Sequence, residues 1–98
     1  MRDRVKFRVR SIVYAALSRD ETILGFAFPK DERAALVAAE PHKFLMPEKS
    51  DERYHWVQAR MTELDIEEMR ELVLDAWQMV VPKKVAAEYF ASADLRSP

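Results

Sequence analysis

Basic and apolar residues alternate at the start of the chain, and this pattern constrains the fold more than any other feature. Four cations occupy every second position and three apolar residues lie between them: Arg4, Lys6, Arg8 and Arg10 against Val5, Phe7 and Val9. A period of two is typical of a β-strand with one buried face. The sequence therefore begins with a half-buried strand, which needs a sheet to join and a layer to cover its apolar side.

Two further strands are predicted to complete a meander. Ser11 offers a turn into residues 12–18, which are rich in β-branched and aromatic residues and favour the second strand of a hairpin. After a polar break, residues 22–28 carry apolar side chains on both faces of a third strand. This strand holds Gly25, the only glycine, which indicates either the close approach of a helix backbone or a β-bulge.

The remaining residues divide into three helices, a loop and one strand. We expect helices over residues 31–40, 66–80 and 83–90, a loop over 42–53 that tucks Phe44, Leu45 and Met46 onto the core, and a strand over 54–61. Asp65 and Glu68 have the spacing of a capping box at the start of the second helix. These elements predict an α+β fold, an antiparallel sheet of about four strands with helices packed on one face.

The helices are predicted from their apolar stripes. The first helix has Ala35, Leu36 and Ala39; the second has Ile66, Met69, Leu72, Val73, Ala76 and Val80; the third has Val85, Ala86, Tyr89 and Phe90.

Composition narrows the class of protein. A chain of 98 residues, 49% apolar and 34% charged, predicts one globular domain over 1–98 with a frayed tail at 91–98. The absence of cysteine and the single glycine exclude thiolate chemistry and glycine-rich phosphate loops, so we expect no enzyme activity, cofactor or small-molecule substrate. No signal peptide or apolar run of about 20 residues is present, which favours a cytoplasmic protein that does not bind membranes.

Four segments stand in a characteristic order along the chain: FRVRSIVYAAL, PKDERAALVAAEPHKF, HWVQARM and IEEMRELVLDAWQMVVPKKVAAEYF. In this order they resemble the MmcQ/YjbR-like family. The resemblance implies a small α+β domain similar in layout to type III secretion chaperones, and DNA binding through a double-wing motif. It brings no cofactor, catalytic set or agreed binding residues. The chain departs from the family in lacking the usual N-terminal helix with its Leu-Pro-Gly stretch, and in having Ser11 where the first hairpin often has glycine.

The basic row is the leading candidate for a binding site. If Arg4, Lys6, Arg8 and Arg10 share one strand face, they can contact phosphates, with Trp56 and Arg60 of the later strand as additional nucleic-acid contacts. The alternative is an exposed edge strand whose charges prevent aggregation. The net charge of −1 predicts that any binding to DNA is weak.

Other polar residues favour structural interpretations. His42 and His55 lack a compact metal-binding spacing, so we expect surface histidines and no metal. The carboxylates at the start of the second helix suit its dipole, although an acidic docking surface is the alternative. These residues are Glu63, Asp65, Glu67, Glu68, Glu71 and Asp75.

A second functional hypothesis is a protein-interaction or chaperone-like module. Without a covering N-terminal helix, the apolar face of Val5, Phe7 and Val9 is expected to be exposed and to be buried by homodimerisation.

Overall fold

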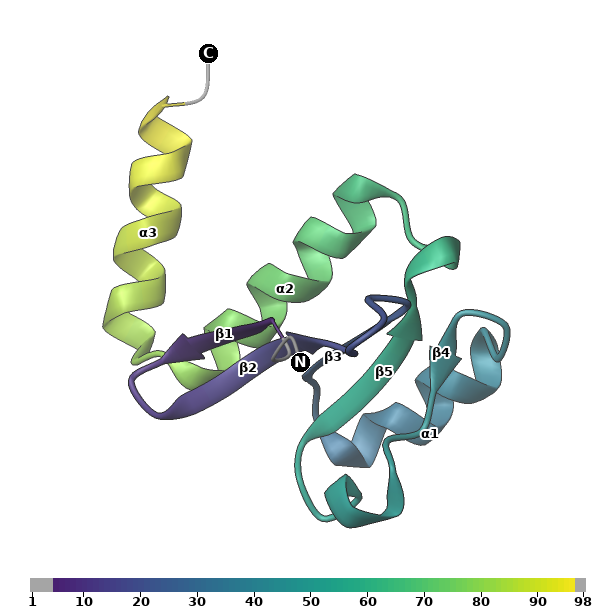
Figure 1. The fold of residues 1–98 in the computed structure, drawn as a ribbon. Coiled ribbons are helices and arrows are strands. Elements are labelled where there is room, and N and C mark those ends of the chain that lie inside the picture. The colour runs from purple at the N-terminus through teal and green to yellow at the C-terminus, as the bar shows by residue number, and fades with distance from the viewer. Residues whose placement is uncertain (1–4, 97–98) are drawn as a thin grey trace.

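A five-stranded antiparallel sheet organises the chain in the computed structural model, which describes residues 5–96 (Figure 1). Its strands are β1 (Lys6–Val9), β2 (Ile12–Leu17), β3 (Ile23–Ala27), β4 (Phe44–Leu45) and β5 (Trp56–Arg60), in the spatial order β1-β2-β3-β5-β4. The meander and the later strand are confirmed. β4 is new, because its two residues lie inside the segment that we expected to be a loop.

Three helices accompany the sheet: α1 (Lys30–Ala39), α2 (Ile66–Val80) and α3 (Lys83–Arg96). Short 3₁₀ turns occur at Lys49–Asp51 and Met61–Glu63. The capping box prediction is confirmed in its first half, since the Asp65 carboxylate accepts a hydrogen bond from the Glu68 amide at 2.7 Å. α3 continues to Arg96, six residues beyond the predicted end, through further residues that favour helix.

One face of the sheet carries the core, and we call it the helix face. Ala15, Phe26 and Val57 are paired across three strands, and Leu17, Leu24, Ala59 and Phe44 form the next row. Side chains of α1 and α2 pack against this cluster, and α2 passes behind β1 and β2 in Figure 1. Phe44 is therefore buried as predicted, whereas Met46 is exposed.

The apolar stripes of the helices differ in detail from the prediction. In α1 the inward residues are Arg33, Leu36 and Val37, while Ala35 and Ala39 are exposed. In α2 the stripe is confirmed except for Ile66, which is 77% exposed in the first turn. The larger Leu36 and Val37 side chains bury more apolar area than alanines, so they set the orientation of α1.

A β-bulge in β2 changes which side chains face α2. Phe7 pairs with Ala15 but Arg8 pairs with Val13, so Tyr14 is the extra residue. Tyr14 lines a small cavity with Val73, Leu74, Trp77 and Tyr89, and it therefore lies on the helix face together with buried Ala15. Beyond the bulge, Val13 shares the opposite face with Arg8.

Polar interactions fasten the edges of the sheet. Lys43, next to β4, forms ion pairs with Glu68 of α2 at 2.7 Å and with Glu40 at 3.4 Å, and the hydrogen bond to Glu68 raises the pKa of Lys43. In the β2–β3 turn, hydrogen bonds from Thr22 and Ser18 lower the pKa of Asp20. These contacts hold β4 against α2 and fix the turn.

Candidate nucleic-acid interface

The sheet face opposite the helix face, here called the open face, collects most of the predicted binding residues. One register row crosses the whole sheet on this face: Lys6, Ala16, Gly25, Gln58 and Leu45. Trp56 and Arg60 flank Gln58 on β5, two residues away on either side, and so face the same way. Among the described residues, no helix packs across this face.

The row of four cations is shorter than the sequence predicted. Lys6 and Arg8 lie on the open face and are exposed. Arg10 does not continue the row, because β1 ends at Val9 and Arg10 occupies the hairpin turn with φ of 56°. Arg4 lies outside the described residues. The prediction of an extended row is therefore wrong at Arg10, where chain reversal overrides the alternation.

Three basic residues of the β1 strand and its turn have no partner among the described residues and are available to an anionic ligand. The side chains of Lys6, Arg8 and Arg10 make no hydrogen bond or ion pair with any of residues 5–96. β1 is an edge strand, as the alternative interpretation required, so the same charges also oppose pairing with another sheet.

The charges within the strands are all of one sign and all on one face. Lys6, Arg8 and Arg60 are the charged residues of the five strands, and each of them lies on the open face. An anionic ligand on this face would therefore meet cations and no strand carboxylate.

Trp56 lies directly over Gly25. A Cβ built on Gly25 would stand 2.7–2.9 Å from three atoms of the Trp56 indole, closer than real Cβ contacts allow. The β3–β5 register is regular at this point. Gly25 therefore admits an indole from the neighbouring strand, and both predicted explanations, a helix backbone and a bulge, are wrong. The Trp56 residue itself is half-buried, so part of the indole remains exposed.

Arg60 and Gln58 have different roles on β5. The Arg60 guanidinium donates to the carbonyls of Pro41 and His42 at 3.2 and 2.9 Å, so it fastens the chain before β4. The Gln58 amide has no hydrogen bond with residues 5–96, although it is half-buried in the centre of the face. We did not single out Gln58 from the sequence, and its position between Trp56 and Arg60 was the available signal.

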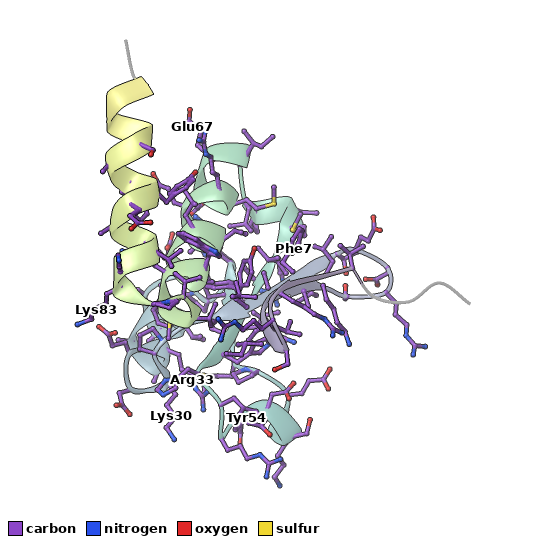
Figure 2. All side chains as sticks on the ribbon, turned by 90° about the vertical axis from the view of Figure 1, so that its left-hand side faces the viewer. Phe7, Lys30, Arg33, Tyr54, Glu67 and Lys83 are labelled. Carbon is purple, nitrogen blue, oxygen red and sulfur yellow. The ribbon has the colours of Figure 1, made fainter. Side chains whose placement is uncertain are left out.

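A buried arginine is the other residue that the sequence did not reveal. The Arg33 side chain is 8% exposed and donates to the carbonyls of Tyr54 and Trp56 at 2.9 and 3.2 Å, and also to that of Glu52. Figure 2 shows Arg33 and Tyr54 together at the end of the molecule opposite Glu67. Arg33 thus anchors the segment that leads into β5 and positions Trp56.

Three of the histidines and carboxylates singled out in the sequence, His55, Asp65 and Glu68, have side-chain partners within the fold. His55 accepts a hydrogen bond at Nδ1 from the first amide of α1, that of Lys30, at 3.0 Å. Asp65 caps α2 and Glu68 pairs with Lys43. Over residues 5–96, no cluster of three His, Asp or Glu side chains could hold a metal ion.

The strand order and the placement of α1 and α2 define a small α+β domain with one covered and one open sheet face. A model of the YjbR family matches residues 2–79, and the chain belongs to this family. α3 lies beyond the matched residues. Within the described part of the chain, none of the helices is long and apolar enough to cross a membrane.

A solved structure supports the same fold. The chain is similar to the crystal structure of protein DR2400 of Deinococcus radiodurans, whose domain is named DUF419, with a TM-score of 0.61 and 20% identity. The similarity covers 83% of this chain and 60% of that protein, so the match spans less than two thirds of that protein's length. No curated protein matches the sequence.

Proposed function

We propose that this YjbR domain is a binding protein without catalytic activity that binds nucleic acid weakly through the open face. The observation that carries the proposal is that Lys6, Arg8 and Arg60, all the charges of the five strands, share this face with Trp56. Cations supply affinity for phosphates through counterion release, and an indole can contact a base. The double-wing DNA binding implied by the family resemblance points to the same class of ligand.

The small number of free cations limits the affinity. Arg60 is held by two carbonyls, which leaves Lys6 and Arg8 as the described cations of the open face that are able to move onto phosphates, with Arg10 in the adjoining turn. The net charge of −1 gives no long-range attraction. We expect dissociation constants of roughly 10⁻⁴–10⁻⁶ M at physiological salt, as for nonspecific binding.

Reversing two charges on the open face should abolish binding. Lys6→Glu combined with Arg8→Glu removes the exposed cations of β1, while solvent-facing substitutions change stability little. In fluorescence anisotropy with a labelled oligonucleotide, the wild-type logarithm of the association constant should fall with the logarithm of salt concentration at a slope of about −2 to −3 on duplex DNA. The double variant should show no saturable signal.

The control reverses two charges elsewhere. Lys83→Glu with Lys84→Glu makes the same change in net charge on exposed positions of α3. Its affinity should stay within about twofold of wild type, because screening confines the effect of distant charges to roughly 10 Å. Equal loss in both double variants would mean that net charge governs binding, and intact binding by the β1 variant would mean that another face is used.

Self-association is the second candidate function, and exposed apolar side chains at the β1–β2 edge favour it. Val5, Phe7 and Ile12 are 39, 40 and 49% exposed. Burying such side chains between two copies would remove apolar area from water. Light scattering at about 100 μM, where a micromolar association is nearly complete, should then report a dimer, and Phe7→Lys with Ile12→Lys a monomer. A wild-type protein that remains monomeric would rule out this function.

A further inference from the structure

We propose that the ligand of the open face is a single-stranded nucleic acid, with one base stacked on Trp56 and its backbone crossing the sheet toward Lys6 and Arg8. The proposal rests on the proposed nucleic-acid binding and names the form of ligand that this face can hold. Three features carry it: the support beneath the indole, the row that crosses the sheet, and the free amide beside the indole.

Gly25 supports Trp56 as a partly exposed platform. Nε1, Cε2 and Cζ2 of the indole all come within 2.9 Å of the place where a Cβ would stand, so the ring rests against the backbone of β3. Its lower side contacts Gly25, and the residue remains only half-buried. Aromatic rings supported by a sheet in this way can stack on an unpaired base, because every base has a π face.

The register row gives the backbone a path to the cations. From Gln58 on β5 the row runs through Gly25 and Ala16 to Lys6 on β1. Three strand spacings span about 14 Å. Sheets of similar width in other proteins accommodate two or three stacked bases, so a strand that begins on Trp56 can place its phosphates beside Lys6 and Arg8.

Gln58 supplies hydrogen bonding without charge. Its side-chain amide carries two donors and one acceptor, and none of them is used by residues 5–96. It lies in the centre of the face, two residues from Trp56 on the same strand. A base stacked on Trp56 would bring its edge within reach of this amide, which can pair with any base.

A duplex cannot use these groups together. In a double helix the bases are stacked on one another and their faces are inaccessible to Trp56. A duplex would meet the cations alone, and none of the helices within residues 5–96 lies above the open face, where it could enter a groove. The geometry therefore favours single strands over duplexes of the same length.

Three oligonucleotides of equal length separate charge from stacking: oligothymidine, the same backbone with abasic sites, and a thymidine–adenine duplex. Wild-type protein should bind oligothymidine about five- to 150-fold more tightly than the abasic strand, the range expected for one stacked base. Trp56→Ala should remove this preference without changing the salt dependence, because no phosphate contact is lost. Trp56→Phe should keep most of it.

Fluorescence provides a measurement that does not depend on the alanine variant being folded. The chain has two tryptophans, so Trp77→Phe leaves Trp56 as the sole tryptophan. Oligothymidine should quench its emission in proportion to binding, whereas the abasic strand should not. Trp77 lies against Tyr89 on α2 and α3, away from the open face.

The outcomes distinguish the two proposals. The single-strand proposal is wrong if the duplex binds as tightly as oligothymidine, or if the abasic and normal strands bind equally. In either case the nucleic-acid proposal stands when Lys6→Glu with Arg8→Glu still abolishes binding. If none of the three oligonucleotides binds, both are wrong. Preference for oligothymidine, lost in Trp56→Ala and retained in Trp56→Phe, supports both.

Discussion

Replacing Arg33 by methionine should lower the free energy of unfolding by about 2–4 kcal/mol, because it removes the donor of three hydrogen bonds from a buried position. Methionine fills much of the volume, but the carbonyls of Glu52, Tyr54 and Trp56 would lose their partner. In a chain of this size, 1 kcal/mol corresponds to roughly 4–8 °C in melting temperature. Thermal unfolding followed by circular dichroism should therefore show a melting temperature lower by about 10–25 °C.

The matched control uses the same substitution on a nearby exposed arginine. Arg53 stacks over the Tyr54 ring at 4.9 Å, and Arg53→Met should cost less than about 1 kcal/mol. Arg33→Lys should fall between the two, since an ammonium cannot reproduce the planar fork that reaches several carbonyls. If Arg33→Met melts within error of Arg53→Met, water replaces the guanidinium at the carbonyls and Arg33 is no anchor.

The anchoring role of Arg33 could not be predicted from the sequence. Its partners are backbone carbonyls 19 to 23 residues away, and every residue has such a carbonyl. The residue types around it indicated an alanine-rich stripe instead. Arg33 faces inward because Leu36 and Val37, three and four residues further on, pack against the core.

Local patterns did predict most of the fold. Three features depend only on residues that are neighbours in the sequence: the alternation around Phe7, the apolar residues of β3 and the cap at Asp65. Such features can be recognised from one sequence. β4 was missed because a two-residue strand has too few residues to show a period. It is defined by partners distant in sequence: its pairing with β5 and the contact of Lys43 with Glu68.

The sequence predicted which residues form the candidate interface better than it predicted how they are arranged. Alternation correctly placed Lys6 and Arg8 on one face of a strand, and Trp56 with Arg60 on one face of another. That the two strands present those residues on the same side of one sheet follows from the register through β2 and β3, which the sequence does not specify.

Gly25→Ala should destabilise the protein by about 1–3 kcal/mol in the wild-type background, as measured by urea denaturation. The new methyl group would stand 2.7–2.9 Å from the Trp56 indole, and the ring would have to leave its place over β3. Without the indole, the sign of this change in stability should reverse. In a Trp56→Ala background the methyl group has room, and alanine is favoured over glycine within a strand by roughly 0.5–1 kcal/mol.

The change of sign follows from the packing of a single pair of residues and makes the test specific. Gly25 pairs with Gln58 in a regular register, so glycine is not required there by backbone conformation, and its φ is not positive. The nearest obstacle to a side chain at residue 25 is then the Trp56 indole, whose atoms are the three closest to the place where a Cβ would stand. If the effects of Gly25→Ala and Trp56→Ala add within about 0.5 kcal/mol, the two residues do not interact in solution. The indole would then not rest on β3, and the open face would lose the platform on which base stacking depends.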